Sequence, residues 1–118
     1  MTMRRTAAGL FCLLMIFSFQ IVSFAGPTEE IAFLLNFIEQ TECIFIRNGK
    51  LYDSLAARQH IEKKYNYYKK EITTAEDFIR YSAEKSSITG KPYKVLCNGV
   101  SMDSSDWLNT ELDRMRAK

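Results

Sequence analysis

The sequence predicts an α+β fold in which four helices pack on a small three-stranded antiparallel sheet. Two observations predict it. Four segments carry apolar residues at the three- and four-residue spacing of a buried helix face. Between them, Asn48-Gly49 separates two short strand-like runs, which is the strongest short signal for a hairpin. With a further strand expected after Pro92, the predicted sheet consists of hairpin 43–52 and strand 92–97.

Residues 1–25 are expected to form a cleaved signal peptide. Arg4-Arg5 precedes an apolar stretch, and Ser23-Phe24-Ala25 has the small-x-small pattern of a cleavage site. A membrane anchor is the alternative, but the uninterrupted apolar run of residues 10–19 is short, since a bilayer span needs about 20 residues. The sequence therefore predicts one domain over residues 26–118, without stable membrane insertion after cleavage.

The exported domain is expected to be formally neutral. Without Arg4-Arg5, the 16 basic residues fall to 14 and match the 14 acidic residues. A neutral domain has no bulk attraction to nucleic acid or to a membrane surface. We therefore expect no nucleic-acid partner, and recognition of an envelope protein or a glycan by a local surface.

Two cysteines, Cys43 and Cys97, remain after cleavage. In an oxidising compartment such a pair predicts a disulfide. Two buried thiols, or a bridge to another chain, are the alternatives. An intramolecular bond would stabilise the fold by about 4 kcal/mol in the chain-entropy model. A small domain depends on such a constraint because its core is limited.

Each predicted helix has a polar start followed by an apolar face. The expected starts are Thr28 within Pro27-Thr28-Glu29-Glu30, Asp53 or Ser54, the capping box Thr73 with Glu76, and residues 103–106. The second helix is expected to run to about Lys70. The expected inward faces are Ile31, Leu34, Leu35 and Ile38; Ala57, Ile61, Tyr65 and Tyr68; Ala75, Phe78, Ile79 and Ser82; and Trp107, Leu108, Leu112 and Met115.

The disulfide, if it joins neighbouring antiparallel strands, sets their register. Cys43 then faces Cys97 and Phe45 faces Val95. The same register places Arg47 beside Tyr93. It therefore predicts that the hairpin turn lies next to the connector Ser86–Tyr93, in which Gly90 permits a positive φ and Pro92 restrains the chain.

The sequence contains little that indicates a catalytic site. The single histidine, His60, has no recognisable partner for metal binding or acid–base chemistry, and Ser86 and Ser87 have no evident base. Thr89-Gly90-Lys91 is not a phosphate loop, because Pro92 replaces the Ser or Thr that such a loop needs. We expect a protein that is not an enzyme, with no metal and no cofactor. An envelope-acting enzyme without a recognised constellation is the remaining enzymatic alternative.

The candidate binding residues lie at the hairpin turn and the connector. Residues 63–70 also interleave cations with tyrosines, but cations near a helix C-terminus and tyrosines on its inner face explain most of that pattern; Tyr67 with its lysines remains a surface candidate. The predicted binding residues are Arg47, Asn48, Tyr52, Ser87, Thr89, Lys91 and Tyr93.

Three motifs in order, residues 44–49 (IFIRNG), 74–79 (TAEDFI) and 86–93 (SSITGKPY), resemble the YfeK-like family of small exported bacterial proteins, a domain of unknown function. The resemblance covers most of the exported domain. It implies a periplasmic location in a Gram-negative bacterium. It implies no activity and no site residues, and the Cys43–Cys97 pair is not typical of that family.

A shorter resemblance suggests an alternative function. Thr89-Gly90-Lys91-Pro92-Tyr93 is similar to the loop that bacterial periplasmic lysozyme inhibitors insert into the enzyme cleft. The resemblance implies inhibition of a lysozyme-type muramidase, with Lys91 meeting catalytic carboxylates. Those inhibitors are β-rich, whereas this chain is predicted to be mostly helical. A purely structural connector explains the same five residues.

Overall fold

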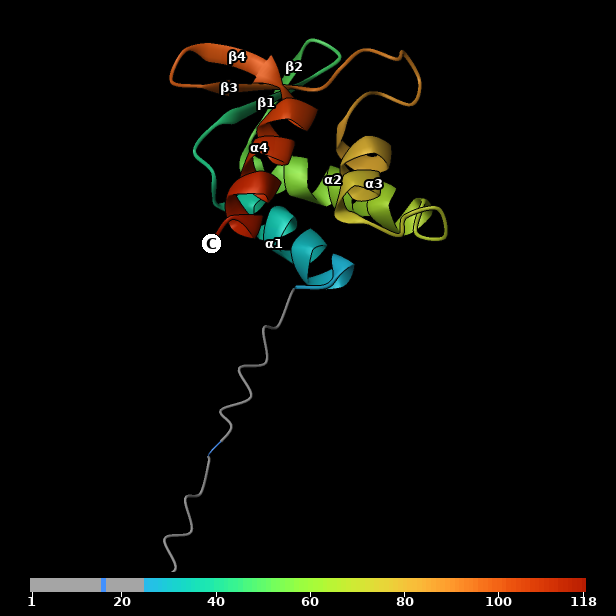
Figure 1. Cartoon of the computed structure of the whole chain (residues 1–118). Coiled ribbons are helices and arrows are strands. Elements are labelled where there is room, and N and C mark those ends of the chain that lie inside the picture. The colour runs from blue at the N-terminus through green and yellow to red at the C-terminus, as the bar shows by residue number, and fades with distance from the viewer. Residues whose placement is uncertain (1–15, 17–24) are drawn as a thin grey trace, which may run out of the picture.

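The sheet has four antiparallel strands in the order β2-β1-β3-β4, and helices gather on one side of it (Figure 1). The computed structural model describes Ile16 and residues 25–118. The elements are α1 (Pro27–Gln40), β1 (Ile44–Arg47), β2 (Lys50–Tyr52), α2 (Ser54–Tyr67), α3 (Ala75–Phe78), the π-helical turn η1 (Ile79–Ala83), β3 (Lys94–Cys97), β4 (Val100–Asp103) and α4 (Ser104–Arg116). The α+β class is confirmed.

The predicted three-stranded sheet is wrong by one strand, β4. Asn98-Gly99 was expected to end the strand, but it turns the chain into a second hairpin. Its φ angles of 51° and 79° repeat those of Asn48-Gly49, 51° and 75°. Residues at these positions of a type I′ turn need a positive φ, which Asn and Gly adopt most readily. β4 was missed because its exposed Val100 and Ser101 give no alternating apolar pattern.

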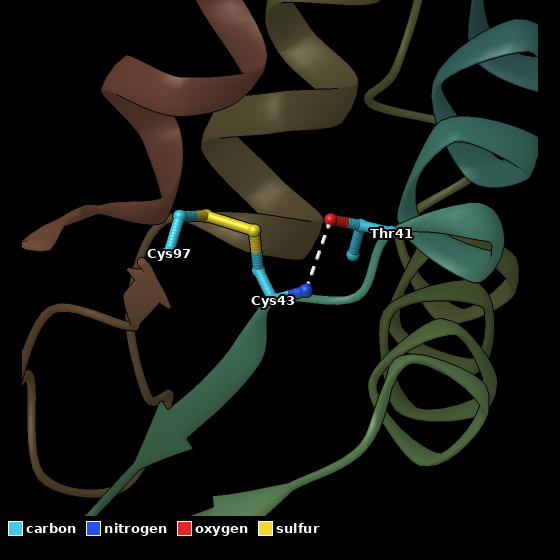
Figure 2. Close-up of a disulfide and its surroundings, with 3 residues drawn as sticks. All are labelled: Thr41, Cys43 and Cys97. Atoms are coloured by element: carbon cyan, nitrogen blue, oxygen red, sulfur yellow. Dashed lines mark hydrogen bonds between the residues drawn. A yellow bond between two sulfur atoms is a disulfide. The ribbon is translucent and has the colours of Figure 1, made fainter. Parts of the chain in front are cut away.

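The predicted register is confirmed. Phe45 pairs with Val95 across antiparallel β1 and β3, and Phe45 also pairs with Tyr52 across the first hairpin. One step beyond the paired residues, Cys43 and Cys97 form the disulfide, with a Cα–Cα distance of 4.7 Å (Figure 2). The amide of Cys43 donates to Thr41 Oγ1 at 3.2 Å, which fixes the chain between α1 and β1. The predicted disulfide within the chain is therefore confirmed.

The core lies between the helices and the inner face of the sheet. Phe78, Leu34, Ile38 and Leu108 are fully buried within it, and Trp107 packs against it from α4. The predicted inward faces are confirmed except at Tyr68. That side chain is half-buried and lies outside the core cluster, on the surface described below. Among the described residues, no helix combines the length and the apolar character needed to cross a bilayer.

Two helix caps differ from the prediction, by two residues in α1 and by one in α3. Gly26 caps α1, and Pro27 takes the first helical position, where its missing N–H costs nothing. Thr74, and not Thr73, accepts from the amide of Asp77 at 3.0 Å, while the Asp77 carboxylate accepts from the amide of Thr73 at 3.1 Å. The capping box is therefore shifted by one position. Asp53 caps α2, as predicted.

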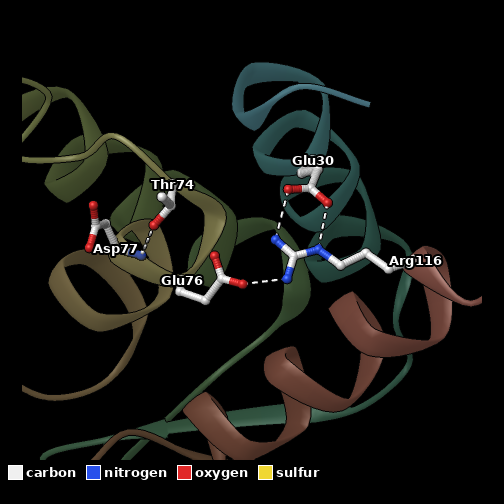
Figure 3. Close-up of polar contacts among 5 residues, drawn as sticks. All are labelled: Glu30, Thr74, Glu76, Asp77 and Arg116. Carbon is white, nitrogen blue, oxygen red and sulfur yellow. Dashed lines mark hydrogen bonds and ion pairs between the residues drawn. The ribbon is translucent and has the colours of Figure 1, made fainter. Parts of the chain in front are cut away.

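An ion-pair network joins three helices at the end of the domain where α1 begins (Figure 3). Arg116 of α4 donates two hydrogen bonds to the buried Glu30 of α1, at 2.7 and 2.9 Å, and also pairs with Glu76 of α3. The hydrogen bonds from Arg116 hold the pKa of both carboxyls below their ordinary value. Sequence reasoning did not find this network because its members lie far apart along the chain.

The expected signal peptide cannot be compared with these elements. Apart from Ile16 and Ala25, residues 1–25 lie outside the described residues, so the cleavage prediction stays a prediction.

Candidate functional site

The first hairpin turn lies against the connector between η1 and β3, as the register predicts. Thr89 Oγ1 donates to Asn48 Oδ1 at 2.6 Å, and Asn48 Nδ2 donates to Ser86 Oγ at 3.3 Å. The connector closes on itself, because the amide of Gly90 donates to the carbonyl of Ser86 at 3.0 Å. Gly90 has a φ of 72°, which few other residues adopt without strain. Two segments distant in sequence thus form one surface.

Tyr93 lies beneath this surface and joins β3 to α2. Its side chain is only 6% exposed. Its hydroxyl lies 3.0 Å from His60 Nε2 and accepts from Lys64 Nζ at 3.3 Å. A hydroxyl both donates and accepts, so the Tyr93 hydroxyl can bond to His60 Nε2 in either tautomer of the ring while it accepts from Lys64.

The surroundings of His60 favour the neutral form of its imidazole ring. Burial, followed by the positive charges of Arg47, Lys64 and Lys63, lowers the pKa of His60 from 6.5 to about 4. Burial and Arg47 lower the pKa of Lys64 as well. These residues approach one another because α2 places His60 and Lys64 one helical turn apart, facing β1 and β3.

The His60 titration gives a direct check of this arrangement. In a pH series of NMR spectra, we expect the His60 ring proton shifts to change with a midpoint near pH 4. Because the unfolded state takes up this proton first, stability should fall as the pH drops from 6.5 towards 4. His60→Gln should remove that part of the pH dependence. A midpoint near 6.5 would contradict the buried, cation-surrounded position.

A surface depression, the cationic cleft, extends from this point. It consists of adjoining hollows of about 370, 320 and 240 Å³. Lys64 and Ser87 line all of them, and the second hollow shares His60 with the first and Tyr68 with the third. The cleft is therefore continuous. It is lined by Arg47, Asn48, Lys50, Tyr52, His60, Lys63, Lys64, Tyr67, Tyr68, Arg80, Tyr81, Lys85, Ser86, Ser87, Ile88 and Tyr93.

Charge is segregated into the cationic cleft although residues 26–118 carry equal numbers of acidic and basic residues. Among the described residues, no Asp or Glu lines the cleft. Of its cations, Arg80 pairs with Asp77, whereas no described carboxylate lies within ion-pair distance of the others. The remaining ion pairs, such as Arg116–Glu30 and Lys94–Asp103, lie elsewhere. Clustered cations without counter-charges repel one another, which favours an anionic ligand.

The structure brings most of the predicted binding residues to the first hollow. Arg47, Asn48, Tyr52, Ser87 and Tyr93 line it, with the Arg47 guanidinium 4.4 Å from the centre of the Tyr52 ring. Thr89 and Lys91 are exposed on the connector and line none of the hollows described above.

Sequence reasoning missed the continuation of the cleft along α2 and η1. The missed lining residues include Tyr68, Arg80, Tyr81 and Lys85. The run of cations and tyrosines at 63–70 was the available signal, but only Tyr67 and its lysines were kept as candidates. The contribution of η1 had no signal, since Arg80 and Tyr81 reach the cleft only through the packing of η1 beside α2.

A smaller hollow of about 20 Å³ lies under the first, lined by Phe45, Tyr52, Ala57, Tyr93 and Ser104 among others. Ser104 Oγ is buried there and has no hydrogen-bond partner among the described residues. Elsewhere in the described chain, no group of His, Cys, Asp or Glu side chains is arranged to hold a metal ion.

Comparison with known proteins identifies a family for this chain. Residues 25–116 match the family of unknown function DUF5329. The chain is also 39% identical over 70 residues to the uncharacterized protein YfeK of Salmonella typhimurium (strain LT2), and the match covers 58% of each chain. The matched segment thus spans a little over half of that relative. No solved structure matches the chain significantly. The YfeK-like resemblance is confirmed.

Proposed function

We propose that this chain, which belongs to the family of unknown function DUF5329, is a non-catalytic binding module of the bacterial envelope. The observation that carries the proposal is the cationic cleft, whose cations other than Arg80 have no described carboxylate within ion-pair distance. A site that collects unpaired positive charge stabilises a bound anion more than it stabilises the fold.

The hydrogen bonds of the cleft support binding over catalysis. His60 is hydrogen-bonded to the Tyr93 hydroxyl, while Lys64 donates to Tyr93 and to the carbonyl of Lys85 at 2.8 Å. Both groups that could serve as a general base are therefore engaged within the fold. The lining offers no carboxylate to act beside them.

Export to the periplasm is part of the proposal. A disulfide across the central strands is typical of an oxidising compartment, which agrees with a signal peptide over residues 1–25. We expect protein isolated from the periplasm to begin at Gly26 when its intact mass is measured. Intact residues 1–118 in the membrane fraction would contradict this.

The binding role can be tested by capture from an envelope extract. The exported protein, immobilised on beads, should retain a component that Arg47→Gln with Lys63→Gln retains at least about tenfold less, since each lost charge contact to an anion contributes roughly 1 kcal/mol. Lys118→Gln, which removes an exposed charge outside the cleft, should retain as much as the wild type.

Two outcomes would count against the binding role. One is equal retention by the wild type and the charge-loss variant. The other is a large fall in the thermal midpoint of that variant, which would mean that Arg47 and Lys63 stabilise the fold. Equal midpoints with unequal retention separate a binding site from a structural one.

Inhibition of a lysozyme-type muramidase remains the alternative and is tested separately. Lys91 is exposed and free to enter an enzyme cleft, but Tyr93 is buried and held by His60 and Lys64. Tyr93 would therefore stay within the fold. Only the other four residues of the pattern, Thr89, Gly90, Lys91 and Pro92, would enter the enzyme cleft. A micromolar excess of the exported protein that slows cell-wall lysis by lysozyme, with Lys91→Ala removing the effect, would favour this alternative.

A further inference from the structure

We propose that the cationic cleft binds a linear glycan that carries carboxylate or phosphate groups along its length. This inference rests on the proposed binding function and adds the chemical class of the ligand. It is carried by the extent of the cleft from the first hairpin to η1, by the repetition of cations and tyrosines along it, and by the polar group that its hollows share.

The shape suits a chain and not a compact molecule. The hollows follow one another from the first hairpin, over α2, to η1, and neighbouring hollows share lining residues. A single small ligand would occupy one of these hollows, whereas successive units of a linear polymer would occupy all of them.

Each hollow combines cations with aromatic rings. The first has Arg47 and Lys50 with Tyr52, the second has Lys63 and Lys64 with Tyr67 and Tyr68, and the third has Arg80 and Lys85 with Tyr81. Anionic groups spaced along a polymer would thus meet a cation in every hollow. Between these charges, the polymer must present faces that pack on tyrosine rings.

The tyrosines of the second and third hollows are arranged for such packing. Tyr67 is 80% exposed, so its ring is open to contact with a ligand. Its ring stands edge-on to Tyr68, with centroids 4.8 Å apart, and Tyr68 lies 5.5 Å from Tyr81. The apolar face of a pyranose ring packs on such an exposed aromatic face, while its edge carries hydroxyl groups.

A hydrogen-bonding group for those hydroxyls lies along the same path. Ser87 is exposed and lines every hollow. Its neutral hydroxyl both donates and accepts, as a sugar hydroxyl requires. A ligand that offered charge alone would leave this group unused.

The neutral net charge of residues 26–118 favours a glycan over nucleic acid as the ligand. Single-stranded nucleic acid also binds to cations interleaved with aromatic rings, but its affinity depends on the neutralisation of many phosphates by a strongly basic protein. Residues 26–118 carry equal numbers of acidic and basic residues. A glycan with one charge per disaccharide needs fewer cations, which fits the cleft better.

The test is an NMR titration of the exported protein with matched hexamers. Hyaluronan hexasaccharide, with one carboxylate per disaccharide, should shift the amides of the cleft segments 47–52, 60–68 and 80–88 in a saturable way. Chitohexaose, a neutral β-linked chain of equal length, should bind at least about tenfold more weakly, as expected for the loss of charge-assisted contacts. Hexaglutamate tests charge without sugar, and hexathymidylate tests a nucleic-acid chain without pyranose rings.

Variants of Tyr67 separate stacking from charge. Tyr67→Ala should weaken binding of the hyaluronan hexasaccharide by about fivefold or more, the lower range for loss of one aromatic stacking partner. Tyr67→Phe keeps the ring and should retain the wild-type affinity. Because Tyr67 is exposed, both variants should keep the wild-type thermal midpoint.

The outcomes distinguish this inference from the binding function on which it rests. Equal or tighter binding of hexaglutamate or hexathymidylate would overturn the glycan assignment and leave an anion-binding cleft. Absence of binding by every hexamer, while capture from the envelope extract still depends on Arg47 and Lys63, would overturn the glycan assignment alone. Absence of both would overturn both proposals.

Discussion

Replacing both cysteines by serine is expected to lower the free energy of unfolding by about 4 kcal/mol. The disulfide closes a loop between residues 54 positions apart, so its loss returns much conformational entropy to the unfolded chain. It also joins the neighbouring strands β1 and β3 at the end of their paired region. Urea denaturation of residues 26–118 and of the same residues with Cys43→Ser and Cys97→Ser measures the difference.

Reduction of the wild type provides the matched control for the serine variant. The reduced wild type and the double variant should unfold at similar urea concentrations, because both lack the same constraint. A domain of this size typically has only about 5–15 kcal/mol of stability, so the expected loss is a large share. A difference below about 0.5 kcal/mol, within the range of ordinary surface substitutions, would contradict a stabilising role for the bond.

Arg116→Met is expected to lower the free energy of unfolding by about 2 kcal/mol, between the effects of breaking a buried pair and an exposed one. The variant leaves the Glu30 side chain, which is only 10% exposed, without its cation, whereas Arg116 itself is 41% exposed. Lys118→Met, at an exposed neighbouring position, should change stability by no more than about 0.5 kcal/mol.

The same network sets the response to acid. The pKa of Glu30 and of Glu76 is lowered in the folded state, chiefly by their hydrogen bonds from Arg116. The unfolded chain therefore takes up protons first as the pH falls, and stability is lost below the ordinary value of 4.5. Arg116→Met should flatten this part of the profile. If the stability of the variant fell with decreasing pH as steeply as that of the wild type, the attribution of this acid response to Arg116 would be contradicted.

The helices and the first hairpin could be predicted from sequence because their signals are local. The spacing of Leu34 and Ile38, the Asp53 cap and the Asn48-Gly49 turn each act within a few residues. β4 escaped prediction although Asn98-Gly99 gives the same turn signal, because an exposed edge strand needs no apolar alternation. Register was predictable only through the cysteine pair, which supplies one long-range constraint.

The candidate site could be predicted at the hairpin turn but not along its length. Arg47, Asn48 and Ser87 were reached through the strand register, which places the turn beside the connector. Tyr68 was assigned to the core from helical spacing alone. It lines the cleft because α2 ends at Tyr67 and the chain turns there, which removes Tyr68 from the inward face. Arg116 pairs with residues remote in sequence, which no local pattern records.

The central claim is that the cationic cleft holds an anion, and salt dependence of binding tests it most directly. The dissociation constant of the component captured from the envelope should be measured between about 50 and about 300 mM KCl, a range over which exposed charge interactions become strongly screened. We predict that affinity of the wild type falls steeply with salt, and that Arg47→Gln with Lys63→Gln gives a shallower slope. Affinity that is independent of salt, or equal slopes for the two proteins, would contradict the claim.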